Sequence, residues 1–501
     1  MSLSAPSYAD WKAPAEDGAT VIWPPPGELC EDARENHRQL STAHELRVQN
    51  VPLTEVRRRQ RAWLGHPDDQ ILIADGHQAE LYHAGVWVKS VLSHFAAEQL
   101  GGSALHLAVD TDAPKHLYLR WPGASVAVTD DPDLSRAQWS GLLDAPSPAH
   151  LNDLRHQLDK ATFAQPPMAG EFLDSLRRLA LEQLGLAPAL TNACHALDWS
   201  LGLRHGAALA SPMWSCEPFL VFVHHVIARA GDFGVAYNRA LAEYRREKKV
   251  RTPTRPMPDL ALEGDSVELP FWLDGLSTGG RARPVARAAD GGFVLTLDNG
   301  DRFRFDPAAD GWDAARRLAQ WLRPHQLRLS PRALALTLFV RLCAADQFVH
   351  GIGGGQYDQI TDRLIASHFG LRPPRFCVTT ATMYLPEAVG RARVCLPCIH
   401  QEGHRLKHAV LGERKRELLA VIAAAPRHSA DRYAAFAALH RELSSAMKRH
   451  AGMRAWEERL RDAQQREAEE SVVFDRELFY AMQPRHRLAE MIDRYRNAFT
   501  G

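Results

Sequence analysis

The chain has 501 residues, of which 45% are hydrophobic and 24% charged, and its 60 basic side chains balance its 60 acidic ones. A chain of this length can bury a large core and suggests several domains or one elaborated domain. The neutral balance gives no electrostatic case for nucleic acid or an anionic membrane surface, so we expect neither as a partner.

Targeting signals and cysteines bear on the compartment. Residues 1–28 contain no basic stretch followed by an apolar one, and no later run approaches the roughly 20 apolar residues of a membrane span. We therefore predict a cytoplasmic protein. The seven cysteines are odd in number and mostly widely spaced, which favours reduced thiols over a disulfide framework.

The first predicted elements form a β-α-β unit. An extended arm that contains WPPPGE (23–28) leads into helical segments, the second of which (55–65) ends at a glycine. A strand at 70–75, a helix from about 80 to 100 and a strand at 104–110 follow. Short apolar strands separated by a helix of this length indicate neighbouring parallel strands.

The middle of the chain changes its hydrophobic period. Residues 150–250 carry apolar residues at spacings of three and four, and no strand is obvious there. Between 265 and 306 the period is two, which predicts a small antiparallel meander outside the core. A second β-α-β unit follows a helix at 331–345. It has a strand at 347–350, a glycine-rich loop at 351–355, a helix at 356–370 and a strand at 375–385.

The predicted fold class is α/β, with both units joined in one doubly wound parallel sheet. Beyond Pro386 the chain is helix-forming, with thin apolar stripes and many Glu/Arg pairs, which is typical of a helical hairpin or a dimeric coiled coil. The core is predicted to have a first part at 1–150 and a second part at 311–390, separated by a helical insertion at 151–260 and a β insertion at 261–310. A coiled-coil arm at 391–475 and a segment at 476–501 that docks on the core follow.

Three polar clusters follow predicted strands, where open α/β sheets keep their ligand sites. The first is DGHQAELYHAGVWVKS (75–90). If the chain is helical beyond its glycine, His77, Glu80 and His83 share one face and are candidate catalytic residues for proton transfer. The alternative is that they are hydrogen-bonded residues at a helix start. The residues of this segment expected to bind a substrate or nucleotide are Gly76, Gln78 and Lys89.

The second cluster is VDTDAPKH (109–116), which follows the next strand. Asp110 and Asp112 are predicted catalytic residues that would hold a substrate amine or a hydrated metal ion. His116, which lies near them, is expected to bind the substrate or nucleotide. A turn rich in Asp and Pro would have the same composition, so a structural role is the alternative.

The third cluster is HGIGGGQYDQITD (350–362). Four glycines before a helix let the backbone approach a ligand closely, and the helix N-terminus supplies N–H groups for phosphate. The segment is neither a GxGxxG nor a Walker motif, and a tight structural turn is the alternative. The residues expected to bind a substrate or nucleotide here are His350, Gly351, Gly353, Gly354, Gly355, Tyr357 and Asp358.

A metal site is not expected in CLPCIH (395–400). Cys395, Cys398 and His400 are close in sequence, but a zinc motif usually has a second ligand pair at a characteristic separation. We therefore predict no zinc. The cofactor is left open, with ATP, ADP or another nucleotide as candidates.

The order of the three clusters resembles the bacillithiol biosynthesis cysteine-adding enzyme family. Segment 75–90 is similar to that family's Gly-Gln-Gln-Ala-Gly-Leu segment, with His77 for the first Gln and Glu80 for the Gly. VDTDAPKH is similar to its acidic, His-rich loop, and HGIGGGQYD to its Gly-Gly-Pro-Gly-Glu loop. The resemblance implies a Rossmann-like core, a nucleotide-sized pocket and a coiled-coil arm that forms a homodimer. The substitutions imply a divergent member with a changed substrate.

The resemblance implies a ligase-like enzyme that joins cysteine, or another amino acid or thiol, to a small amine-bearing metabolite. A nucleotidylyltransferase is the enzymatic alternative, because a Rossmann-like core with an early His-rich segment is similar to that class as well, although a His-x-Gly-His motif is missing. The non-enzymatic alternative is a scaffold whose coiled coil recruits partners.

Overall fold

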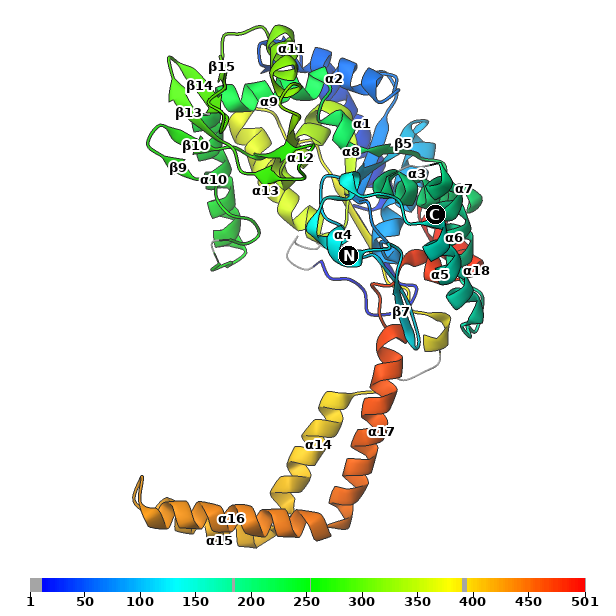
Figure 1. The fold of residues 1–501 in the computed structure, drawn as a ribbon, viewed down its shortest axis with the longest axis vertical. Coiled ribbons are helices and arrows are strands. Elements are labelled where there is room, and N and C mark those ends of the chain that lie inside the picture. Colours follow the sequence, from blue (N-terminus) through cyan, green and yellow to red (C-terminus); the bar gives the residue numbers. More distant parts are fainter. Residues whose placement is uncertain (1–10, 183–184, 253, 390–393, 501) are drawn as a thin grey trace. The chain divides into compact units, whose positions relative to one another are not determined.

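The computed structural model describes residues 11–182, 185–252, 254–389 and 394–500 (Figure 1). Its contacts divide the chain into two compact units. Unit 1 comprises Met1–Leu119, Ser125–Met383 and Arg476–Gly501. Unit 2 comprises Arg120–Ala124 and Tyr384–Asp475.

The main sheet of unit 1 confirms the predicted mixed α/β class. Its six strands have the spatial order β1-β18-β17-β4-β5-β8. All neighbours are parallel except β1, which pairs antiparallel with β18 at one edge. The bounds are β1 Thr20–Trp23, β4 Leu72–Gln78, β5 Ser103–Val109, β8 Gly206–Leu209, β17 Gln347–His350 and β18 Cys377–Ala381.

The direction in which the sheet is built reverses between β4 and β17. From β4 the chain moves outward to β5 and then β8, and it returns beside β4 as β17 before moving the other way to β18. Helix α3 (Ala84–Leu100) joins β4 to β5, and α13 (Ile352–His368) joins β17 to β18. Because such crossovers are right-handed, α3 and α13 cover opposite faces of the sheet. Ligands of open α/β sheets bind at the carboxyl ends of the strands at such a reversal.

Residues 151–260 contribute to this sheet, so the prediction of a helical insertion outside the core is wrong at one point. Strand β8, at Gly206–Leu209, pairs in parallel with β5. Its sequence, Gly-Ala-Ala-Leu, has no β-branched or aromatic residue. Such residues are the usual strand signal, which explains why the sequence pattern did not reveal it.

The predicted antiparallel region forms two small sheets. One has the order β15-β14-β13-β10-β9 and the other the order β12-β11-β16. Their bounds are β9 Leu262–Glu263, β10 Ser266–Glu268, β11 Phe271–Gly275, β12 Arg281–Ala282, β13 Val285–Ala289, β14 Gly292–Thr296, β15 Arg302–Phe305 and β16 Leu327–Pro331. Helix α9 (Glu217–Ala228) is buried, and its large hydrophobic cluster includes residues from β4, β5, β10, β14 and β15.

The remaining helices of unit 1 pack on these sheets or on one another. They are α1 Pro26–Thr42, α2 Leu53–Trp63, α4 Pro132–Ala137, α5 Pro148–Lys160, α6 Ala169–Leu181, α7 Leu186–Ser200, α8 Ala210–Met213, α10 Ala230–Glu247, α11 Gly311–Leu322, α12 Ala333–Phe339 and α18 Arg485–Thr500. In the described part of the chain, no single helix is long and apolar enough to cross a membrane, although the bent pair α9 and α10 meets that test jointly.

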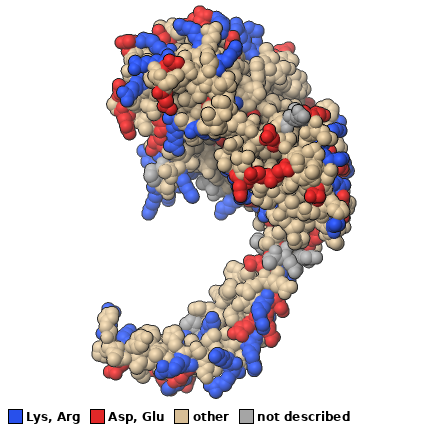
Figure 2. All heavy atoms as spheres, viewed as in Figure 1, with Lys and Arg blue, Asp and Glu red and all other residues tan. Residues whose placement is uncertain are grey.

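Unit 2 consists mainly of helices. Helix α14 packs along α17, and α15 packs along α16 (Figure 1). A small hydrophobic cluster of Leu418, Ile422 and Leu439 holds the second pair together. The bounds are α14 Leu396–Ala409, α15 Gly412–Ala424, α16 Ala430–Arg449 and α17 Ala451–Val473. In the view of Figure 2, basic and acidic side chains are interspersed over both units, as the balanced composition leads one to expect.

Candidate functional site

Two cavities of unit 1 meet at the carboxyl ends of β4 and β17. One, which we call the anion pocket, has a volume of about 500 Å³, and the other, the apolar pocket, has about 520 Å³. Both have the size of sites for small organic ligands. They share four lining residues, namely Gly76, His77, His350 and Gly354. Two cavities therefore adjoin at the reversal point of the sheet, and these four residues line both of them.

Two helices begin at the anion pocket. The start of α3 contributes His83, and the start of α13 contributes Gly351 and Gly353. The first turn of a helix leaves N–H groups without intrahelical partners and carries a partial positive charge. A Cβ atom added at Gly351 or Gly353 would meet no atom within 4 Å. A ligand can therefore approach the start of α13 closely.

Charged side chains add to the positive character of the anion pocket. Lys89 donates a hydrogen bond to the carbonyl of Gly76, and Arg476 donates to Thr380 Oγ1 at 3.4 Å and to the carbonyl of Ala381 at 3.2 Å. Burial lowers the pKa of Lys89 to about 8, although Asp75 opposes the shift. Lys89 is thus largely protonated at pH 7. Of the described residues, none with an acidic side chain lines this pocket.

His77 lies at the boundary of the two pockets as a neutral imidazole. It belongs to β4, and its Nδ1 is 3.6 Å from Glu80 Oε1, which is too long for a hydrogen bond. Burial, and then the positive charges of Lys89 and His106, hold the pKa of His77 well below its usual value. His77 can therefore accept or donate a hydrogen bond without carrying charge.

His350, at the end of β17, is oriented by a buried carboxylate. Its Nε2 lies 2.9 Å from Asp358 Oδ2, and Arg341 Nη1 donates to the same oxygen at 2.7 Å. Burial would raise the pKa of Asp358, but Arg341 and His350 outweigh it and hold the pKa below its usual value. An ionised Asp358 accepts the Nε2–H, so Nδ1 of His350 is left as the basic nitrogen. This atom lies beside Gly354.

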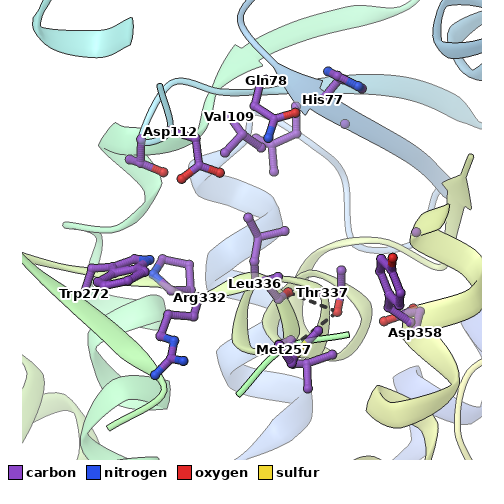
Figure 3. Close-up of a pocket in the computed structure, with 18 of the residues that line it drawn as sticks. His77, Gln78, Val109, Asp112, Met257, Trp272, Arg332, Leu336, Thr337 and Asp358 are labelled. Carbon is purple, nitrogen blue, oxygen red and sulfur yellow. Dashed lines mark hydrogen bonds between the residues drawn. The ribbon is translucent and has the colours of Figure 1, made fainter. Parts of the chain in front are cut away.

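The apolar pocket is lined mainly by hydrophobic side chains from distant parts of unit 1 (Figure 3). Trp272 lies toward one end of it and Asp358 toward the other, with Leu336 and Met257 between them. The ends of β4 and β5 add Gln78 and Val109, followed by Asp112. Asp112 also pairs with Arg281 at 3.3 Å. This cavity fits a ligand with an apolar body and a few polar groups.

Glu80 and Asp110 were predicted to be catalytic, but each holds a loop in place. Glu80 Oε2 accepts hydrogen bonds from the backbone N–H groups of Lys115 at 2.6 Å and His116 at 3.1 Å. Asp110 accepts from the N–H of Ser211 at 2.7 Å and from its hydroxyl at 2.5 Å. Both carboxylates are buried and lie outside the linings described for the two pockets.

The predicted helix over the first cluster is also wrong. His77 is on β4, Glu80 lies in the connection, and His83 caps α3 by accepting from the N–H of Gly85 at 3.0 Å. Pairing with β5 extends β4 as far as Gln78, which keeps this part of the cluster out of the helix. Spacing on a helix face therefore does not describe the site.

The glycine-rich segment is helical and is not the predicted loop. Helix α13 starts at Ile352, so Gly353, Gly354 and Gly355 form its first turn. Gly355 lies outside both described linings. It faces β18, because a Cβ atom at this position would come within 2.4 Å of Val378 Cγ2. His116, predicted to bind substrate, also lies outside both described linings. Tyr357 and Asp358 line the apolar pocket.

Sequence reasoning missed several lining residues. They are Thr380 and Arg476 in the anion pocket, and Met257, Trp272 and Arg332 in the apolar pocket. Thr380 could have been found, because it lies one residue before the end of β18, the strand beside β17. The others lie far along the chain from every cluster and have no local motif, so only the tertiary structure reveals them.

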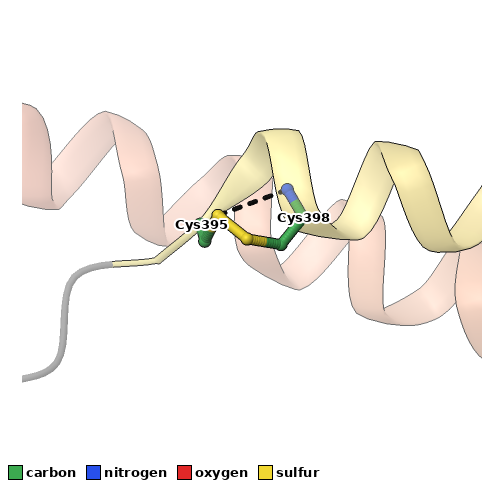
Figure 4. Close-up of a disulfide and its surroundings, with 2 residues drawn as sticks. All are labelled: Cys395 and Cys398. Carbon is green, nitrogen blue, oxygen red and sulfur yellow. Dashed lines mark hydrogen bonds between the residues drawn. A yellow bond between two sulfur atoms is a disulfide. The ribbon is translucent and has the colours of Figure 1, made fainter.

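The predicted preference for reduced thiols over disulfides does not hold for one pair. Cys395 and Cys398, at the start of α14, form a disulfide (Figure 4). The other cysteines, which are buried and free, are Cys30, Cys194, Cys216, Cys343 and Cys377. Among the residues that the structure describes, no group of three or more His, Cys, Asp or Glu side chains is placed to hold a metal ion.

No protein-family model matches the chain, and no curated protein matches its sequence. The function must therefore be argued from the geometry of the two pockets.

Proposed function

We propose that the protein is a condensing enzyme of the ligase type, which joins an anionic donor in the anion pocket to an acceptor in the apolar pocket. The observation that carries the proposal is that the two cavities share His77 and His350. They do so at the reversal point of a sheet whose parallel strands have the order of a Rossmann-like fold. Ligands in two adjoining cavities can meet at these residues, which is the proximity that a two-substrate reaction needs.

The donor is proposed to carry a phosphate or carboxylate. Two helix starts, Lys89 and Arg476 line one cavity, and none of its described lining residues is acidic. Helix N-termini and basic side chains together bind such anions. A nucleotide such as ATP or ADP is the candidate that provides phosphates and has a matching size.

The acceptor is proposed to have an apolar body and an amine. Trp272, Met257 and Leu336 provide apolar surface, and the carboxylate of Asp112 can pair with a positively charged group. This cavity supports the expectation of a divergent member with another amine-bearing metabolite.

Proton transfer is proposed to be the role of His350. Asp358 fixes its ring and leaves Nδ1 as the base, in the lining that both pockets share. When a neutral nucleophile attacks the donor, a positioned base that accepts its proton typically contributes about 10²–10⁴-fold to the rate. His77, which is neutral, can orient either ligand by hydrogen bonding.

A nucleotidylyltransferase is the second candidate. Two helix starts and two basic side chains in one cavity could hold more than one phosphate group, as a nucleoside triphosphate requires. This reaction would release pyrophosphate and leave an adenylate on the acceptor, whereas an ATP-independent condensation would release neither.

The test is a thermal-shift and calorimetric screen with ATP, ADP, pyrophosphate, citrate, cysteine and amino-sugar conjugates, followed by mass spectrometry of the products. We expect at least one phosphate or carboxylate compound to raise the melting temperature, because a ligand that binds only the folded state stabilises it. Lys89→Met should weaken that ligand about 10-fold or more, since hydrogen bonds to charged groups contribute about 1.5–3 kcal/mol. Lys160→Met, an exposed lysine on α5, is the matched control.

The proposal fails if no anion shifts the melting temperature, or if Lys89→Met and Lys160→Met bind equally well. Binding to another protein alone, lost on removal of residues 410–470, would support the scaffold alternative. The homodimer through α14–α17 stays a prediction, which the molecular mass in solution tests with and without that deletion.

A further inference from the structure

The cysteines fall into two physical classes. Cys395 and Cys398 are exposed and joined by a disulfide, whereas the other cysteines of the chain are buried. An exposed disulfide can be attacked by a thiolate from solution, and a buried thiol cannot easily take part. The first class is therefore the one open to exchange chemistry.

A purely structural role explains this disulfide poorly. Its two cysteines are three residues apart and both lie at the start of α14. A cross-link gains stability mainly by closing a long loop of the unfolded chain, so a ring of this size constrains little. The bond also ties no distant segments together.

The surroundings of Cys395 favour its thiolate in the reduced form. Cys395 is the N-cap residue of α14, and its Sγ accepts a hydrogen bond from the N–H of Cys398 at 3.2 Å. A helix N-terminus and a Cys-x-x-Cys spacing are two of the features that favour the reactive thiolate form of a cysteine. Figure 4 shows both sulfur atoms at this helix start.

The helix that carries the pair is anchored within unit 2. Trp456 of α17 donates its indole N–H to the carbonyl of Ile399 at 2.7 Å, one residue after Cys398. Glu470 accepts from the N–H of Val394 at 3.0 Å, one residue before Cys395. Hydrogen bonds from α17 thus fix the backbone on both sides of the Cys-x-x-Cys motif.

We propose that Cys395 and Cys398 form a thiol–disulfide exchange site, whose substrate is an external disulfide. In the reduced protein, the Cys395 thiolate attacks one sulfur of R–S–S–R. A Cys395–S–R bond forms, and R–S⁻ leaves with the electron pair of the broken bond. The Cys398 thiol then gives its proton to solvent and attacks Cys395 Sγ, which releases the second R–S⁻. Two protein thiols are oxidised and R–S–S–R is reduced to two thiols.

The experiment uses the full-length protein and intact-mass spectrometry. The protein is equilibrated with reduced and oxidised glutathione at a series of ratios, quenched with an alkylating reagent and weighed. We expect a single two-electron transition confined to Cys395 and Cys398. A pair that stays in one redox state at every ratio would overturn the proposal, and so would a transition located at the buried cysteines.

Two matched variants test the roles of the sulfur atoms. Cys398→Ser should accumulate a mixed disulfide on Cys395, because the resolving thiol is missing. Cys395→Ser should react with oxidised glutathione about 10-fold more slowly, because Cys398 lacks the N-cap position. Equal rates for the two variants would contradict the assignment. Repeating the reaction with insulin distinguishes a protein disulfide from a small one as the preferred substrate.

Discussion

Two regions at the same edge of the main sheet look alike in sequence and differ in space. At the ends of β4 and β17, His77 and His350 line cavities of about 500 Å³. Beyond β5, Asp110 is bound to the backbone and hydroxyl of Ser211, and a Cβ atom at Gly141 would come within 2.9 Å of its carboxylate. All three are polar residues at the end of a buried parallel strand, yet His77 and His350 line a cavity whereas Asp110 lies outside both described linings.

The difference follows from the winding of the chain. Between β4 and β17 the connections leave in opposite directions, so no short loop fills the space over these strand ends. On the β5 side the chain continues in one direction to β8, and Ser211 follows that strand and closes over Asp110. A polar residue after a strand thus indicates a site only where no other segment of the chain closes over it.

The largest expected effect is a loss of turnover on substitution of His350, the residue of this sheet edge that we propose as the base. His350→Gln keeps an amide donor toward Asp358 but removes the basic nitrogen, so turnover should fall by about 10²–10⁴-fold with little change in melting temperature. The measurement is product formation with the substrate pair found in the ligand screen. Turnover within threefold of the unaltered protein would exclude His350 as the base.

Asp110 and Asp112 should behave oppositely although they are two residues apart. Asp110→Ala leaves the N–H of Ser211 unpaired in the interior and should cost about 2–3 kcal/mol in the free energy of unfolding. Asp112→Ala, in which a partly exposed ion pair is lost, should cost less than about 1 kcal/mol. Denaturant titration measures both.

Ligand binding gives the complementary readout for this pair of aspartates. The anion should still bind to folded Asp110→Ala, whereas Asp112→Ala should weaken an amine-bearing acceptor. The reverse pattern would mean that Asp110, and not Asp112, contacts the acceptor.

Gly354→Val should displace the His350 ring. The new Cβ would lie 2.8 Å from His350 Nδ1, so the ring has to move, and anion affinity should fall about 10-fold as the shared lining changes. The imidazole resonances of His350 in an NMR spectrum report the movement. In Gly353→Ala the added atom meets nothing within 4 Å, so these resonances should stay in place.

The smallest expected effect is a pH dependence of anion binding. Lys89 has a pKa lowered to about 8, so it is charged below that pH and neutral above it. Anion affinity should therefore fall as the pH rises, by up to about 10-fold between pH 7 and 9. Isothermal calorimetry with pyrophosphate measures the slope. The same slope in Lys89→Met would assign the titration to another group.

Part of the fold could be read from local patterns. The apolar runs of β4, β5 and β18 and the period of two between 265 and 306 have strong signals, and the structure contains strands there. Strand β8 was missed because alanine and glycine have no strand preference. The start of α3 was placed at about residue 80, whereas the helix begins at Ala84, where His83 caps it.

The sequence by itself determined which residue types are available at the strand ends, including His77, His350 and the glycines of α13. Their placement at strand ends could be predicted because it depends on local hydrophobic periodicity and on the backbone preferences of glycine. Only the tertiary structure decided that Glu80 and Asp110 accept backbone hydrogen bonds outside the two linings, and that Trp272 and Arg476 line the pockets. The physical reason is that a buried polar group must find a hydrogen-bond partner. Where the backbone of a distant segment lies within reach, the group anchors that segment, and where none does, it is left to bind a ligand; local sequence does not encode which case holds.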